Sequence, residues 1–151
     1  MYNRQEASLL RKKFWTGFGQ YMRPVTGANG DTINWLNYKT GIRHIYFRMD
    51  ADSSHAAIAI ELRHPDRELQ RGNFEKLLQL KVILKQSIGE DWNWQLLAED
   101  EDGHFVSKVS KEFREVNIFR EEDWPAIISF LKPRIIALDG FWQLVKDGFE
   151  Q

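Results

Sequence analysis

Two carboxylates and a basic group lie on neighbouring stretches of the chain, where they could hold a metal ion. Asp50 ends one alternating stretch, and Glu61 and Arg63 lie two residues apart on the next. Metal-dependent nucleases of the PD-(D/E)XK type place an Asp and a Glu-x-Lys on adjacent strands, so that the carboxylates hold magnesium and the Lys acts on water. Here Arg63 replaces the Lys and is a poor base. A magnesium-dependent nuclease using Asp50, Glu61 and Arg63 is therefore an alternative hypothesis.

The same stretches favour a binding surface for an anion. Alternation along two strands would put His44, Tyr46 and Arg48 on one face together with Glu61 and Arg63. Basic groups interleaved with aromatic rings suit phosphates and unstacked bases. We expect one or both Arg side chains to hold Glu61, and two Arg groups against one carboxylate would leave a positive surplus, although a purely structural ion-pair lattice explains the same residues. The predicted ligand-binding residues are Tyr38, Lys39, His44, Tyr46, Arg48, Glu61 and Arg63.

Other catalytic and metal-binding patterns are weak. The four histidines form no ligand pair at helical spacing, and only His44 and His64 could meet across strands. The acidic run at 99–103 lacks the spacing of a calcium loop. Neither a phosphate-binding loop nor a nucleophile elbow occurs. We therefore expect no catalytic residue, metal or cofactor outside the magnesium-dependent alternative.

Strands must position these residues. The apolar period is two along residues 33–39, 42–49 and 55–64, which predicts three strands joined by short links. A second hairpin is predicted over 91–97 and 104–109, around the acidic loop. Short connections make neighbouring strands antiparallel. We therefore expect an antiparallel sheet of about five strands.

Helices should flank this sheet. Asn3 and Glu6 form a capping box before a predicted helix over about 5–21, and Asp66 can cap a second helix that reaches Gly89. The clearest helix follows Glu121, with apolar residues stepping by three and four from Ile128 to Phe149 and with Pro133 opposite that seam. The element order α-β-β-β-α-β-β-α indicates an α+β fold that ends in a long, kinked helix.

Length and composition limit the class of protein. The 151 residues suit one domain spanning 1–151, and 21 basic against 22 acidic residues exclude a strongly basic nucleic-acid coat. The chain has no cysteine, which excludes disulfides and thiolate metal sites. No apolar run is long enough to cross a membrane. We expect a cytoplasmic protein with no membrane partner.

Several long sequence words resemble one family. They are FWTGFGQYM at 14–22, NWLNYKTG at 34–41, YFRMDAD at 46–52, IAIE at 58–61, DWP at 123–125, SFLKPR at 129–134 and FW at 141–142. These words are similar to a bacterial family known as domain-of-unknown-function family 4268, and the resemblance covers nearly the whole chain. It implies no agreed activity. Some relatives carry a similar segment behind a nuclease-like domain, which implies a connection with nucleic acid.

The leading hypothesis is a non-catalytic binding or adaptor module connected with nucleic-acid processing. Its expected partner is a polyanion or nucleic acid, bound at the charged face of the central hairpin. The C-terminal helical seam, rich in Trp and Phe, also suggests a homodimer.

Overall fold

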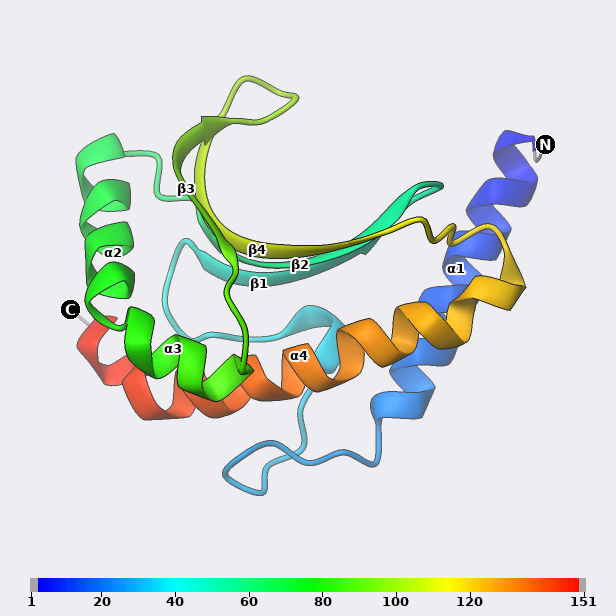
Figure 1. Cartoon of the computed structure of the whole chain (residues 1–151), viewed down its shortest axis with the longest axis horizontal. Coiled ribbons are helices and arrows are strands. Elements are labelled where there is room, and N and C mark those ends of the chain that lie inside the picture. Colours follow the sequence, from blue (N-terminus) through cyan, green and yellow to red (C-terminus); the bar gives the residue numbers. More distant parts are fainter. Residues whose placement is uncertain (1–2, 150–151) are drawn as a thin grey trace.

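The computed structural model describes residues 3–149, which form an antiparallel sheet with helices on one side (Figure 1). In the described part of the chain the sheet has four strands in the order β1-β2-β4-β3. Their bounds are Ile45–Ala51 for β1, His55–Leu62 for β2, Asn93–Glu99 for β3 and Phe105–Arg114 for β4. All three strand pairs are antiparallel, so the predicted α+β class is confirmed.

The predicted strand at 33–39 is wrong, which reduces the expected five strands to four. This segment contains the short 3-10 helix η1, Trp35–Asn37, which the Asn34 side chain caps by accepting a hydrogen bond from the Asn37 amide. Trp35 and Tyr38 are both buried. Because they lie three positions apart, the burial has the spacing of a turn and not the two-residue period of a strand.

The helix α1, Arg4–Met22, begins at the predicted capping box. Asn3 accepts a hydrogen bond from the Glu6 amide at 2.8 Å, and its side-chain amide donates to the Glu6 carboxylate. These reciprocal bonds satisfy donors that the first helical turn leaves free. Phe14 and Phe18 then bury one stripe of the helix.

The predicted helix over 66–89 is divided at Leu80. The first part, α2, is Arg67–Gln79, and the second, α3, is Lys81–Ile88. Leu80 leaves helical geometry, with ψ near 10°. The two parts pack on different surfaces, because α2 contacts strands of the sheet whereas α3 contacts the C-terminal helix α4, Trp124–Val145. One straight helix could not follow both surfaces.

The helix α4 confirms the prediction of a long C-terminal helix, and it continues through Pro133. Pro133 is exposed, as its position opposite the seam predicts. Along the seam, Leu131, Leu138 and Trp142 are almost completely buried in the core that α4 shares with the sheet. The seam behind the homodimer hypothesis is therefore covered by the chain itself.

Short 3-10 turns flank α4: η2, Glu121–Asp123, precedes it, and η3, Lys146–Phe149, follows it. The core lies between the helices and the facing side of the sheet, where Phe47, Ile58 and Ile60 are at most 5% exposed. Fully burying an aliphatic or aromatic side chain of this size contributes about 1.5–3 kcal/mol.

No helix among residues 3–149 is long and apolar enough to span a membrane.

Candidate functional site

The sheet face opposite the helices is polar and concave, and no helix of the described residues lies over it (Figure 1). We call it the open face. Strand alternation assigns side chains to it, because cross-strand partners point to the same side. The open face comprises Tyr46, Arg48 and Asp50 of β1, His55, Ala57, Ala59 and Glu61 of β2, Asn93 and Gln95 of β3, and Lys108, Ser110, Glu112 and Arg114 of β4.

The predicted contact of Glu61 with arginine is present on this face, and both Arg48 and Arg63 take part in it. The Glu61 carboxylate lies 2.8 Å from Nε of Arg63 and 3.6 Å from Nε of Arg48. The Glu61 side chain is only 16% exposed, whereas that of Arg48 is 53% exposed. Arg63 is therefore the tight partner of Glu61, and Arg48 keeps most of its guanidinium donors free for another acceptor.

A second carboxylate joins this cluster. Asp100, from the turn between β3 and β4, lies 3.7 Å from Arg63. Burial favours the neutral form of Arg63, but hydrogen bonds and charges from Glu61 and Asp100 outweigh it and raise the pKa of Arg63. The expected surplus of two arginines over one carboxylate is therefore wrong. The acidic run at 99–103 was the sequence signal, but its place beside Arg63 depends on how the two hairpins pair.

Lys108 restores a positive surplus, and the sequence hypothesis did not include it. It lies opposite Glu61 on β4, and no carboxylate of residues 3–149 approaches its ammonium within ion-pair distance. Its position within the predicted strand 104–109 was a usable signal, since residues two apart share a face. The cluster thus contains Arg48, Arg63 and Lys108 against Glu61 and Asp100.

Tyr46 gives the cluster an aromatic surface. Its ring is 36% exposed, and the Arg48 guanidinium lies 4.6 Å from the ring centroid. This cation–π contact orients Arg48 along the strand while the guanidinium edge remains free. An exposed ring beside a guanidinium is an arrangement on which a planar base can stack.

Tyr38 and Lys39, which were predicted to bind ligand, lie off the open face. Tyr38 is 7% exposed, stacks on Phe47 and donates a hydrogen bond to Asp139. Burial and the Asp139 carboxylate raise the pKa of Tyr38 well above its ordinary value. Lys39 is exposed in the segment before β1. Tyr38 is therefore part of the core, because the segment predicted as a strand turns inward towards α4.

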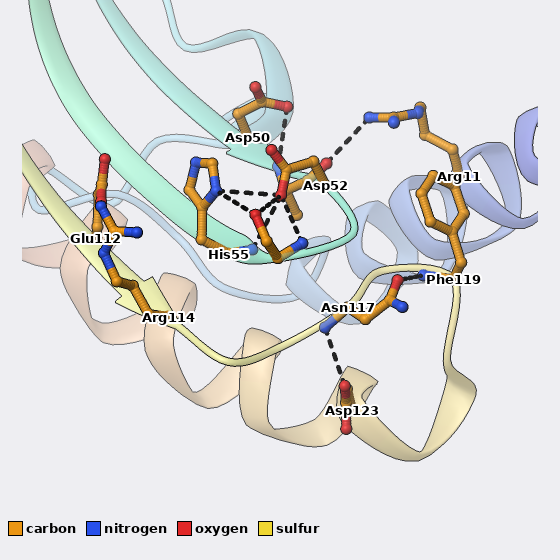
Figure 2. A network of polar contacts seen from close by, with 11 residues as sticks. Arg11, Asp50, Asp52, His55, Glu112, Arg114, Asn117, Phe119 and Asp123 are labelled. Atoms are coloured by element: carbon orange, nitrogen blue, oxygen red, sulfur yellow. Dashed lines mark hydrogen bonds and ion pairs between the residues drawn. The ribbon is translucent and has the colours of Figure 1, made fainter.

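Asp50 is separated from Glu61 by the strand register. Glu61 pairs with Tyr46, four residues before Asp50, which corresponds to about 13 Å along a strand. Figure 2 places Asp50 beside the turn between β1 and β2, where its carboxylate accepts a hydrogen bond from the Ala51 amide. Although both carboxylates are on the open face, they do not converge on one ion.

The same turn brings together a serine, a histidine and an aspartate (Figure 2). Nδ1 of His55 lies 3.1 Å from Asp52 and 3.3 Å from the Ser54 hydroxyl. A catalytic triad needs the acid and the nucleophile on different ring nitrogens, so this group cannot activate the serine. Burial opposes ionisation of Asp52, but amide hydrogen bonds from Ser54 and His55 outweigh it and lower its pKa. The group is therefore a cap for the turn.

A polar hollow of about 500 Å³ lies over β3 and β4. Its lining includes the side-chain amides of Asn93 and Gln95, the cation Lys108, the carboxylate of Asp91, and Arg114 in an ion pair with Glu112. Amides both donate and accept hydrogen bonds, so the hollow can receive the edges of bases as well as phosphate oxygens. It shares Lys108 with the cluster and so extends the candidate site across the sheet.

Within residues 3–149, the group whose ligand atoms come close enough for a metal ion is Asp100, Asp102 and His104. One Asp100 oxygen already accepts the amides of Asp102 and His104, and the other faces Arg63. The group is therefore explained by the turn between β3 and β4.

The comparisons with known proteins give one match. A family model described as "Domain of unknown function (DUF4268)" matches residues 10–146. No curated protein and no solved structure matches the chain.

Proposed function

Because the chain belongs to the DUF4268 family, whose description assigns no activity, we propose a function from the open face: a non-catalytic module that binds a single-stranded nucleic acid. The proposal depends on the contact of Arg48 with the exposed Tyr46 ring, and on Lys108, which lies in the same cross-strand row two strands away and has no carboxylate partner among residues 3–149. These groups offer a stacking surface and phosphate-binding cations on one concave sheet.

The shape of the face supports an extended ligand. The helices pack on the other side of the sheet, and the strands leave a curved surface that continues into the hollow over β3 and β4 (Figure 1). The small side chains of Ala59 and Ser110 face one another at its centre. Because these side chains are small, a nucleic-acid strand could lie close to the sheet between the cluster and the hollow.

The mixed charge of the face favours moderate, salt-sensitive binding. Glu61 and Asp100 neutralise much of Arg63, whereas Arg48 and Lys108 remain available. Each phosphate contact to a single strand contributes a slope of about −0.7 in a plot of log K against log salt. Two available cations therefore predict a shallow but measurable dependence on salt.

The test is a titration of a fluorescent single-stranded oligonucleotide of about 12 nucleotides, within the site sizes known for single domains. We expect Arg48→Ala with Lys108→Ala to weaken binding roughly tenfold and to reduce the salt slope by about 1.4. The matched control is Lys12→Ala with Arg23→Ala, which removes one lysine and one arginine from exposed positions of α1 and its C-cap. Equal loss in both variants would show that only net charge matters.

The nuclease alternative predicts a different outcome. With magnesium, wild-type protein would shorten the oligonucleotide, and Glu61→Gln would abolish that cleavage. We expect the oligonucleotide to remain intact, because about 13 Å of strand separates Asp50 from the position opposite Glu61. Magnesium-dependent cleavage that requires Glu61 would replace the non-catalytic proposal.

A further inference from the structure

A second cavity lies at the open end of the β1–β2 hairpin, opposite the turn that joins the two strands, and neither Arg48 nor Lys108 lines it. Its volume is about 480 Å³, within the range of pockets that hold small molecules. Four segments of the chain build it: residues 41–44 before β1, His64 after β2, Asn73 of α2 and Phe149 of η3. Because these segments are far apart in sequence, the cavity exists only in the folded chain.

This cavity has a basic lining without a counter-charge. Its described lining contains Arg43, His44 and His64 and no carboxylate. Within residues 3–149, none of these three side chains has an ion-pair partner, whereas Arg63 nearby is held by two carboxylates. The adjacent Asp66 carboxylate is turned to α2, where it caps the first turn. The cavity therefore lacks the counter-charge that the neighbouring cluster contains.

A hydrogen bond fixes the tautomer of the neutral His64 ring. The Asp66 amide donates to Nδ1 of His64 at 3.0 Å. Since Nδ1 accepts, the proton of the neutral ring is on Nε2. The rings of His44 and His64 meet edge to face with centroids 4.5 Å apart, and Asn73 adds a side-chain amide to the lining. The cavity thus combines a guanidinium, two imidazoles and an amide.

The backbone at His44 is held in a defined conformation. His44 has a φ of 69°, in the left-handed region that residues other than glycine seldom adopt. Its carbonyl accepts the Arg63 amide at 2.8 Å, and the buried Thr40 hydroxyl donates to the Ile45 carbonyl on the next residue. Such conformations persist where surrounding structure enforces them, and they concentrate at ligand sites. A backbone held in this way loses little further freedom when a ligand binds.

We infer that this cavity binds a phosphate group, in the form of a phosphomonoester or the terminal phosphate of a nucleic-acid strand. A doubly charged oxyanion would supply the missing counter-charge, and a guanidinium binds two of its oxygens at once. The imidazoles and the Asn73 amide provide further donors for the remaining oxygens. The inference does not rest on the proposed function of the open face, because the two sites share no residue.

Histidine titration provides a direct test in the wild-type protein. Burial, followed by the charges of His64 and Arg43, lowers the pKa of His44. A bound oxyanion reverses that electrostatic effect. We therefore expect saturating inorganic phosphate to raise the NMR-measured pKa of His44, while chloride at equal ionic strength leaves it unchanged. An unchanged pKa of His44 in phosphate would overturn the inference, and this measurement needs no variant.

Variants then locate the site. Arg43→Ala should weaken phosphate binding roughly tenfold by calorimetry, whereas Lys39→Ala, which removes a nearby exposed charge outside the cavity, should change it less than about twofold. His64→Asn should also weaken binding, because asparagine can still accept the Asp66 amide but has no donor at the Nε2 position. Equal effects of Arg43→Ala and Lys39→Ala would contradict a built site.

Two probes distinguish the sources of the phosphate. Phenyl phosphate represents a small phosphomonoester, and 5′-phosphorylated and unphosphorylated oligonucleotides represent a strand end. The inference is supported if wild-type protein binds either probe more tightly because of its phosphate group and if Arg43→Ala removes that difference in affinity. Arg48→Ala with Lys108→Ala should leave phenyl phosphate binding intact, so the two proposals can fail separately. Zinc binding at His44 and His64 with no response to phosphate would overturn the inference in favour of a metal site.

Discussion

The phenol of Tyr38 donates a hydrogen bond to the carboxylate of Asp139, 101 residues later in the chain. Asp139 is 1% exposed and also accepts the Ala28 amide at 2.7 Å and the Gln143 side-chain amide. A buried carboxylate is stable only when hydrogen bonds replace its water. The contact therefore fixes the segment before β1 onto α4, and the first two predictions concern it.

Replacing Tyr38 with Phe should lower the free energy of unfolding by about 1–3 kcal/mol, because Asp139 loses a donor that water cannot replace in the core. Urea denaturation measures the change. The matched control is Tyr21→Phe, since Tyr21 is 51% exposed and its hydroxyl contacts only Lys132 among the described residues, at 3.3 Å. That change should stay within about 0.5 kcal/mol. Equal effects would mean that the buried hydrogen bond adds no stability.

Gly27→Ala should destabilise the protein by about 1–3 kcal/mol, through overpacking. An added Cβ would lie 2.8 Å from Ile33 and 3.2 Å from the Asp139 carboxylate. Thermal denaturation measures the loss. Gly17→Ala in α1 is the control, because its Cβ would meet nothing within 4 Å and alanine favours a helix by about 0.5–1 kcal/mol. The two substitutions should thus act in opposite directions, and a stabilising Gly27→Ala would contradict the observed packing.

Glu90→Gln should lower stability by about 1–2 kcal/mol at pH 7 and should have a decreasing effect in acid. Arg134 binds both Glu90 oxygens, at 2.8 and 3.0 Å. Burial opposes ionisation, but hydrogen bonds from Arg134 and Trp92 outweigh it and hold the pKa of Glu90 below its ordinary 4.5. A carboxyl group whose pKa is lowered by folding stabilises the folded state fully at a pH above its pKa in the unfolded chain. This stabilisation is lost as the pH falls through its pKa in the folded protein.

Urea denaturation of wild type and Glu90→Gln between pH 7 and pH 3 checks this prediction. The difference in unfolding free energy should shrink below about pH 4.5, the ordinary value. Glu122→Gln is the control, since Glu122 lies 3.7 Å from Arg120 and both side chains are exposed. Its effect should be small at every pH. A constant difference for Glu90→Gln would show that ionisation of Glu90 is not involved.

Pro133→Ala should leave stability unchanged or raise it by up to about 3 kcal/mol, the penalty of a proline inside a helix. Pro133 is exposed within the continuous helix α4, so alanine restores a backbone donor without touching the core. Guanidinium denaturation measures the change. Pro125→Ala is the control, because proline in the first helical turn costs little. A loss of several kcal/mol at Pro133 would mean that the proline is needed to shape the helix.

The sequence by itself determined the local parts of this structure. Alternation predicted the β1–β2 hairpin and placed Arg48 and Glu61 on one face, since successive side chains of a strand point to opposite sides. Spacings of three and four predicted α4 and the exposed position of Pro133. These patterns depend on neighbours within a few residues, so they can be read from the chain directly.

Only the tertiary structure decided which distant residues meet. Residues around Tyr38 have a strand-like pattern, yet they turn inward. There the Tyr38 hydroxyl donates a hydrogen bond to the buried Asp139 carboxylate of α4. The helix over 66–89 divides because its two parts pack on different surfaces. Asp100 reaches Arg63, and four separate segments build the cavity beside Arg43, through the pairing and packing of whole elements. Periodicity carries no information on such contacts, because their energy depends on the complete packed chain.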